Sequence, residues 1–145
     1  MTALLFWASL IFVLYTYALY PLLILIAARL AGHPPAAREN DPLPPVTMIV
    51  VAFDEESRIE AKLENIAALD YPVDRFRAIV VSDGSTDRTG EILRGRGDIE
   101  AIVDDTNRGK PAQLNRALAS IEEGIVVFSD VRQMWEPGAV RALVR

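Results

Sequence analysis

The stretch "RAIVVSDGSTDRTGEIL" (residues 77–93) decides the fold class, because a strand, a polar turn and a helix follow one another in it without a break. Its four consecutive apolar residues are typical of a strand that is buried on both faces. In the polar run that ends the strand, we expect Gly84 to permit a tight turn, Ser85 to cap the next helix and Asp87 to lie in that helix's first turn. Asp83 stands at the tip of the strand, where its carboxylate either belongs to a simple turn or accepts hydrogen bonds from a polar ligand such as a nucleotide.

Strand and helix patterns alternate along the rest of the C-terminal part of the chain. Apolar runs rich in β-branched residues predict strands at 46–53, 77–81, 99–105 and 125–130. Helical patterns lie at 57–72, 85–95, 110–124 and 136–145. Strands that are joined by crossover helices pair in parallel, with right-handed connections. The sequence therefore predicts an α/β fold, namely an open, doubly wound, mostly parallel sheet with helices on both faces.

The first predicted helix shows the helical pattern most clearly. Ile59, Leu63 and Ile66 form one apolar stripe, which we expect to pack against the sheet. Ser57 and Glu60 have the spacing of a capping box, so we expect the helix to begin at Ser57.

Residues 1–31 are of a different kind. Residues 1–28 contain no Asp, Glu, Lys or Arg, and this apolar run exceeds the roughly 20 residues that a helix needs to cross a bilayer. A signal peptide is the alternative, but it needs a basic start and a shorter apolar core. We therefore expect one retained transmembrane helix at 1–31, in which Pro21 frees a backbone carbonyl and introduces a kink.

The residues after this helix set its expected orientation. Arg29, Arg38 and the titratable His33 follow the helix, and no Lys or Arg precedes it. The positive-inside rule then places the following domain in the cytoplasm, at the cell (inner) membrane. We interpret the Pro-rich run 32–45 as a linker and 46–145 as the globular domain.

Composition excludes several classes of function. The net charge of −5 argues against a nucleic-acid partner, because general nucleic-acid binding needs a basic surface. The chain has no cysteine and a single histidine, His33, which excludes disulfides, zinc thiolates and histidine-dependent catalysis in the domain. No G-x-G-x-x-G follows the first predicted strand and no Walker A motif is present, which argues against a dinucleotide or P-loop site.

Each predicted strand ends in polar, mostly acidic residues. The four strand ends read "AFDEE", "SDGSTD", "DDTNRGK" and "SDVRQ". The carboxyl ends of parallel strands meet at one edge of the sheet, and sheets of this kind bind ligands there. Any one of these runs also fits a helix cap. Four together would repel one another unless a cation or a ligand rich in hydrogen-bond donors balances them.

Three residues at this edge suit a phosphorylated ligand. Lys110 stands at the entrance of a predicted helix, where it either meets a diphosphate or neutralises Asp104 and Asp105. Asp130 has the oxygen ligands that Mg²⁺ or Mn²⁺ prefers, and an ion that bridges phosphates would stabilise a departing nucleoside diphosphate. Arg132 is placed to clamp phosphates directly.

The order of these motifs resembles the membrane-bound family 2 glycosyltransferases, which have a GT-A, Rossmann-like fold. The similar blocks, in the same order and at similar spacing, are "VAFDEE", "DYP", "IVVSDGSTDRT", "NRGKPAQLNRAL" and "IVVFSD". The resemblance covers residues 46–145. It implies a glycosyltransferase with a nucleotide-diphospho-sugar donor and a lipid or polysaccharide acceptor, acting in synthesis of the cell envelope.

Carried over position by position, the resemblance implies a donor-binding site. Val51, Phe53 and Glu55 would line the nucleoside pocket. Asp83 would contact the base or the ribose, and Lys110 would lie near the phosphates.

The resemblance also implies a metal ligand, with departures from the family's pattern. Asp130 matches the first Asp of the family's Asp-x-Asp metal motif, but Arg132 replaces the second Asp. Use of Mg²⁺ or Mn²⁺ is therefore open: either Arg132 supplies a fixed charge in place of the ion, or another ligand comes from elsewhere. Phe53-Asp54 stands where the family usually has Tyr-Asn, and Ser82 replaces the first Asp of Asp-Asp-Gly-Ser.

In this family an acceptor-binding half with the catalytic base follows the donor-binding half. Glu136 is the only carboxylate after Asp130, and it fits the start of a helix. We therefore expect the catalytic base to lie beyond Arg145, so that its identity is unknown from this sequence. The chain would then be the donor-binding portion, incomplete at its C-terminal end and inactive alone.

Two other hypotheses stay open. One is a catalytically inert nucleotide-sugar-binding or scaffold subunit of a membrane complex. The other is a nucleotidyltransferase, which would need a glycine-rich basic loop after the first strand.

Overall fold

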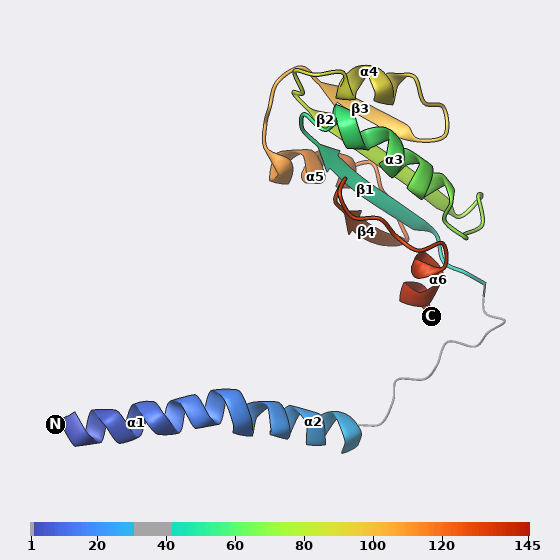
Figure 1. Ribbon diagram of the computed structural model, residues 1–145. Helices are drawn as coiled ribbons and strands as arrows, with labels where there is room; N and C mark the ends of the chain where they lie inside the picture. Colours follow the sequence, from blue (N-terminus) through green and yellow to red (C-terminus); the bar gives the residue numbers. More distant parts are fainter. Residues whose placement is uncertain (1, 31–41) are drawn as a thin grey trace. The chain divides into compact units, whose positions relative to one another are not determined.

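The computed structural model describes residues 2–30 and 42–145, and the chain divides into an N-terminal unit and a C-terminal domain (Figure 1). Most of the predicted linker at 32–45, with His33 and Arg38, lies outside the described residues. The linker boundaries and the part that these two residues play in orientation therefore stay predictions.

The described residues of the N-terminal unit, 2–30, form one continuous helix. It consists of α1 (Thr2–Leu14), the π-helical turn η1 (Tyr15–Leu19) and α2 (Tyr20–Leu30). The π-helical turn comes just before Pro21, which has no N–H to donate to the preceding turn. By length and composition the helix can cross a membrane, and Arg29 is the basic residue of its last turn.

The domain is built on a parallel sheet of four strands. The strands are β1 (Val46–Ala52), β2 (Phe76–Asp83), β3 (Glu100–Asp104) and β4 (Ile125–Ser129). They lie in the order β3-β2-β1-β4, and each neighbouring pair is parallel. The predicted α/β fold with an open, parallel sheet is confirmed.

Helices cover both faces of this sheet (Figure 1). The helices α3 (Glu56–Ala67) and α4 (Thr89–Arg94) pack on one face, and α5 (Lys110–Leu118) packs on the other. The short helix α6 (Ala139–Val144) follows near the C-terminus and packs through Val140 on the same side as α3. The sheet is therefore doubly wound, as predicted.

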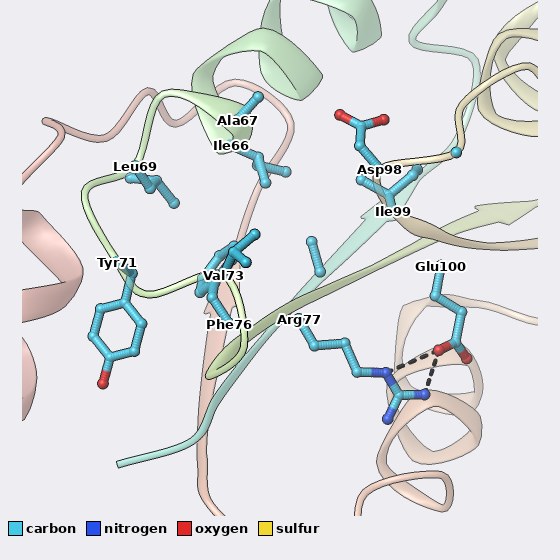
Figure 2. Close-up of a pocket in the computed structure, with 12 residues that line it drawn as sticks. Ile66, Ala67, Leu69, Tyr71, Val73, Phe76, Arg77, Asp98, Ile99 and Glu100 are labelled. Atoms are coloured by element: carbon cyan, nitrogen blue, oxygen red, sulfur yellow. Dashed lines mark hydrogen bonds and ion pairs between the residues drawn. The ribbon is translucent and has the colours of Figure 1, made fainter. Parts of the chain in front are cut away.

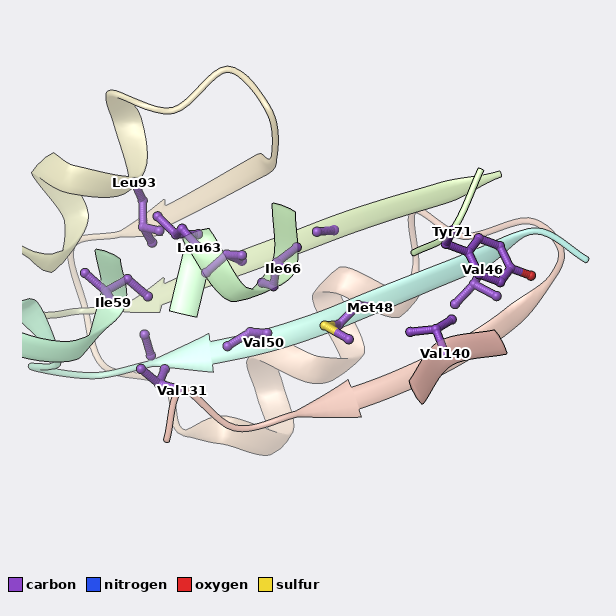
Figure 3. Close-up of a cluster of buried hydrophobic side chains, with 13 residues drawn as sticks. Val46, Met48, Val50, Ile59, Leu63, Ile66, Tyr71, Leu93, Val131 and Val140 are labelled. Atoms are coloured by element: carbon purple, nitrogen blue, oxygen red, sulfur yellow. The ribbon is translucent and has the colours of Figure 1, made fainter. Parts of the chain in front are cut away.

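Two apolar clusters hold the layers together. In β1, Met48 and Val50 face the side of α3 and α4, whereas Ile49 faces the side of α5. The predicted stripe of α3 completes the larger cluster, in which Ile59 and Leu63 are fully buried (Figure 3). Full burial of such a side chain contributes roughly 1.5–3 kcal/mol, so the central strand β1 is fixed between both layers.

A hollow lies at the opposite end of the sheet from the acidic strand tips. It has a volume of about 470 Å³ and lies at the amino ends of β2 and β3, against the last turn of α3. Its floor is apolar, with Ile66, Phe76 and Ile99 among the lining residues, and an ion pair between Arg77 and Glu100 stands at its rim (Figure 2).

Candidate functional site at the carboxyl edge of the sheet

A second pocket lies at the carboxyl edge of the sheet, where the strand order changes direction. From β1 the order runs to β2 and β3 on one side, whereas β4 lies on the other side of β1. Open α/β sheets bind their ligands at such a point. The pocket has a volume of about 270 Å³ and is lined by Val51, Ala52, Phe53, Glu55, Asp83, Asn107, Gly109, Lys110, Asp130 and Val131.

The residues predicted for donor binding meet at this pocket. Those that line it directly are Val51, Phe53, Glu55, Asp83, Lys110 and Asp130. Arg132 is not among the lining residues, but its Nε atom donates a hydrogen bond to Oε1 of Glu55 at 2.9 Å. The structure thus brings these side chains together from the ends of different strands. Their role in donor binding stays a prediction at this point.

The residues that follow Arg132 do not contribute a catalytic base to this pocket. Glu136 lines a different hollow with Met134 and Trp135 and is not among the residues that line the pocket at the carboxyl edge. Arg145 is exposed, directly follows α6 and is not among those lining residues either. That the catalytic base lies beyond Arg145 stays a prediction, because no described residue tests it.

Asp83 is 3% exposed and holds the loop that precedes α5. Its Oδ1 atom accepts a hydrogen bond from the N–H of Arg108 at 2.8 Å, and its Oδ2 atom accepts one from the N–H of Gly109 at 2.9 Å. The side-chain amide of Gln113 also donates to Oδ1, at 2.7 Å. These donors satisfy a buried carboxylate. A contact to a base or a ribose would therefore add to these bonds rather than replace them.

Gly84 lets two loops cross beside this carboxylate. Its φ is +67°, and a Cβ atom at this position would lie 2.2 Å from the backbone nitrogen of Asn107. The N–H of Gly84 donates to the carbonyl of Asp104 at 3.0 Å. The predicted tight turn at Gly84 is confirmed, and close approach of the next loop is a second reason for glycine there.

The rest of the "SDGSTD" run connects the loop after β1 to the loop after β2. Asp54 has a φ of +51°, a conformation that Asp and Asn adopt more readily than most residues. Its carboxylate accepts the N–H of Thr86 at 2.7 Å, and its own N–H donates to Oγ of Ser85 at 3.2 Å. The predicted helix cap at Ser85 is therefore wrong, because this side chain serves the loop after β1. Asp87 lies before α4 rather than in its first turn, and it accepts the N–H of Thr89 at 2.9 Å.

Glu55 and Arg132 form an ion pair beside the pocket. The side chain of Glu55 is 11% exposed, and its Oε1 atom lies 2.8 Å from Nη2 of Arg132. Arg58 pairs with the other carboxylate oxygen at 3.3 Å. A guanidinium carries five N–H donors, and the side chain of Arg132 is 66% exposed. The pair therefore leaves donors of Arg132 for a further anion.

Lys110 and Asp130 face each other across the same pocket. Nζ of Lys110 lies 3.4 Å from Oδ2 of Asp130. The backbone N–H of Arg132 donates to Oδ1 of Asp130 at 3.1 Å. This backbone bond, with a smaller contribution from the Lys110 ammonium, holds the pKa of Asp130 below its ordinary value against the opposing effect of burial. Asp130 is therefore a carboxylate near neutral pH.

Comparison with known proteins identifies the family of this domain. Residues 47–145 match the model of glycosyl transferase family 2. The chain belongs to this family. It is 33% identical over 118 residues to the probable glycosyltransferase YdaM of Bacillus subtilis, which covers 76% of this chain and 28% of that protein. It is 34% identical over 103 residues to the beta-monoglucosyldiacylglycerol synthase of Synechocystis sp., which covers 61% of this chain and 20% of that protein.

The solved structure of a mannosyltransferase has a similar fold. It is the mannosyltransferase PcManGT from Pyrobaculum calidifontis in complex with GDP-Man and Mn²⁺. The TM-score is 0.67 at 33% sequence identity, over 88% of this chain and 40% of that one. The chain thus spans less than half of the length of these glycosyltransferases.

Asp130 is the residue of this family 2 domain that fits a divalent cation. It is ionised, its side chain is 45% exposed, and it lines the pocket. Mg²⁺ is usually held by one or two carboxylates together with phosphate oxygens and waters. In the part of the chain that the structure describes, no group of three or more His, Asp or Glu side chains gathers around a point. A site with Asp130 as the only protein ligand would fit such an ion where phosphate oxygens and waters supply the other ligands.

Two buried polar residues at the site were missed by sequence reasoning. Lys62 and Gln113 both have no exposed surface. Gln113 donates from Nε2 to the carboxylates of Asp83 and Asp104, at 2.7 Å each, and so bridges two like charges. The signal for Lys62 is its position three residues after Ile59 on the apolar stripe of α3. A charged side chain on a buried face needs a polar partner, and the sequence does not show which one.

Proposed function

We propose that this chain binds a nucleotide-diphospho-sugar as the donor for glycosyl transfer. The observation that carries the proposal is the meeting of Glu55, Asp83, Lys110 and Asp130 around one pocket at the point where the strand order changes. Membership of glycosyl transferase family 2 supports it, as does the GDP-Man bound to the related mannosyltransferase.

The two halves of the pocket suit the two halves of such a donor. Val51 and Phe53 offer apolar surface to the base, and the buried carboxylate of Asp83 offers an acceptor to the base or to a ribose hydroxyl. Lys110 and Arg132 offer positive charge to the diphosphate. Because negative charge grows on the diphosphate as the sugar leaves, fixed cations at this place stabilise the transition state more than the bound donor.

A divalent ion, when bound, would supply further stabilisation of the departing nucleoside diphosphate as a Lewis acid. Asp130 is the residue that would hold Mg²⁺ or Mn²⁺, and Mn²⁺ is present in the related mannosyltransferase. The guanidinium of Arg132 stands where the family's second Asp would be. We therefore propose that it carries part of the charge compensation that the ion carries in relatives.

We also propose that the acceptor is a lipid or a glycan at the cytoplasmic face of the cell membrane. The helix Thr2–Leu30 can cross a membrane by length and composition, and Arg29 at its end supports a cytoplasmic domain under the positive-inside rule. The related beta-monoglucosyldiacylglycerol synthase, whose name contains a glycolipid, supports a lipid acceptor.

Calorimetric titration of the 145-residue chain in detergent tests the donor site. We expect GDP or UDP to bind, and to bind more tightly with Mn²⁺ than with EDTA. Lys110→Ala is expected to weaken binding about 10- to 100-fold, because it removes a charged hydrogen-bond donor to phosphate. Arg88→Ala is the matched control, since the side chain of Arg88 is exposed and pairs with Glu91. Equal affinities of the wild type and Lys110→Ala, or binding of neither nucleotide, would contradict the proposal.

A further inference from the structure

The chain has only two lysines, Lys62 and Lys110, and both direct their ammonium groups to the region of Asp130. Lys110 reaches it from the rim of the pocket. Lys62 reaches it from α3, and its side chain has no exposed surface. Its Nζ atom donates to Oγ of Ser129 at 2.8 Å and to the carbonyl of Gln133 at 2.5 Å. Lys62 thus holds the chain on both sides of Asp130.

A neighbouring residue of α3 holds the same segment further along. Nδ2 of Asn65 donates to the carbonyl of Trp135 at 2.7 Å, and Oδ1 of Asn65 accepts the N–H of Trp135 at 2.8 Å. Lys62 and Asn65 lie three residues apart on one side of the helix. Together they fasten to α3 the 130–135 segment, which carries Asp130 and Arg132.

The same helix also presents Glu55, the residue at its N-cap, to Arg132. One rigid element therefore sets both ends of the Glu55–Arg132 pair. It holds Glu55 at its own start, and through Lys62 and Asn65 it holds residues on either side of Arg132, namely Ser129, Gln133 and Trp135.

Burial of a lysine costs free energy, which packing alone does not explain. Burial lowers the pKa of Lys62, whereas the charge of Asp130 raises it. Replacement of buried ion pairs by apolar residues of similar volume is often neutral or stabilising, so buried charge is weak evidence of a purely stabilising role. The position on an apolar stripe therefore favours a role beyond stability.

We infer that Lys62 and Asn65 are positioning residues for donor binding, which act by fixing Asp130 and Arg132 against α3 at the edge of the pocket. This inference rests on the proposed function, since the positioned groups are those assigned to the diphosphate and its metal. It adds residues that touch no ligand themselves. Partners that orient a ligating side chain typically change metal affinity or activity about 10- to 100-fold when they are removed.

Two measurements on the 145-residue chain in detergent test the inference, with Lys62→Met and Asn65→Leu as variants. The first is amide hydrogen exchange without any ligand. The N–H groups of Asp130, Arg132, Gln133 and Trp135 are all hydrogen-bonded within this region. We expect them to exchange faster in both variants, while the amides of β1 and β2 keep their protection.

The second measurement is the affinity for GDP and UDP with Mn²⁺. We expect both variants to bind the nucleotide about 10- to 100-fold more weakly. We expect Lys62→Met to have a smaller further effect in an Asp130→Asn background, because part of its effect acts through that residue. Glu64→Met is the control, since Glu64 lies exposed on the same helix.

The outcomes separate the two proposals. Unchanged affinity in Lys62→Met and Asn65→Leu, with a wild type that binds, would overturn the positioning role alone. Unchanged exchange in the 130–135 segment would do the same. A wild type that binds neither nucleotide would overturn the proposed function and, with it, the functional meaning of Lys62.

Discussion

The two ends of the sheet contain the same strands but differ in how they use charge. At the amino ends, charged side chains pair on the surface, as Arg77 does with Glu100, around a hollow with an apolar floor. At the carboxyl ends, Glu55 and Asp83 are buried, and other charges converge on the space between them. The hollow at the amino ends is the larger of the two, at about 470 Å³ against about 270 Å³. The smaller hollow is thus the one with buried charge, and buried charge, rather than volume, is typical of functional sites.

At the amino ends, hydrogen bonds within the chain also fix the segment that leads into β1. The N–H of Ile125 donates to the carbonyl of Pro45 at 2.9 Å, and the hydroxyl of Tyr71 donates to that of Pro44 at 2.7 Å. These bonds anchor the start of β1. The ion pairs at this end of the sheet are exposed, and exposed ion pairs contribute little to stability. The carboxyl ends instead hold cations and carboxylates around an open pocket, an arrangement that a charged ligand can complete.

The largest expected difference between the two ends concerns glycine. Gly84→Ala would place a Cβ atom 2.2 Å from the backbone of Asn107 at a φ of +67°, so we expect a loss of more than about 2 kcal/mol in the free energy of unfolding and loss of nucleotide binding. Gly97→Ala at the other hollow meets no atom within 4 Å and should change stability by less than about 0.5 kcal/mol. Urea unfolding in detergent measures both. Equal effects of the two substitutions would show that the loop crossing at Gly84 is not tight.

A smaller difference is expected between two carboxylates. In Asp83→Asn, an NH₂ group replaces one of the two oxygens that accept the N–H groups of Arg108 and Gly109, so one donor loses its acceptor. We expect a loss of about 1–3 kcal/mol in the free energy of unfolding and weaker nucleotide binding. Glu100→Gln weakens an exposed ion pair and should cost less than about 1 kcal/mol. The same unfolding experiment compares them. A larger cost for Glu100→Gln would contradict the view that burial of charge separates the two ends.

The elements of the fold were predictable because they depend on local patterns. Continuous apolar runs gave the strands, and the period of Ile59, Leu63 and Ile66 gave the buried face of α3. Helix ends were less predictable. The predicted capping box at Ser57 and Glu60 is wrong, because α3 begins at Glu56 and Asp87 accepts the N–H of that residue from another loop.

Two predicted helices are too long, because tertiary contacts decide where they begin and end. The helix predicted at 110–124 ends at Leu118, and Gly124 serves the entry to β4 instead. Its φ is +100°, and a Cβ atom there would lie 2.6 Å from the carbonyl oxygen of Pro45. The helix predicted at 136–145 is also shorter than expected, because α6 spans Ala139–Val144 and Pro137 precedes it.

The candidate site was predictable as far as topology determines it. Residues that follow parallel strands meet at one edge, so Glu55, Asp83 and Asp130 could be placed together from the sequence. The support beneath them could not. Lys62 bonds to Ser129 across 67 residues of sequence, and no periodicity indicates that pair.

The smallest expected effect separates two carboxyl groups that both have a lowered pKa. At the amino end, a hydrogen bond from Arg96 lowers the pKa of Asp98, and at the carboxyl end the N–H of Arg132 lowers that of Asp130. For each group the folded pKa lies below the unfolded one. Its stabilising contribution is therefore present above the ordinary carboxyl pKa of about 3.9 and is lost as the pH falls through the folded value.

Carboxyl carbon NMR titration of the chain in detergent, with and without GDP and the diamagnetic ion Mg²⁺, distinguishes these two groups. A cation on Asp130 would stabilise its charged form, so we expect its pKa to fall further when both ligands are present. Asp98 is the internal control, because it lines the hollow at the other end and should titrate unchanged. If the pKa of Asp130 rose instead, the diphosphate would lie beside it without an ion between them, and Arg132 and Lys110 would be the charges that hold the donor.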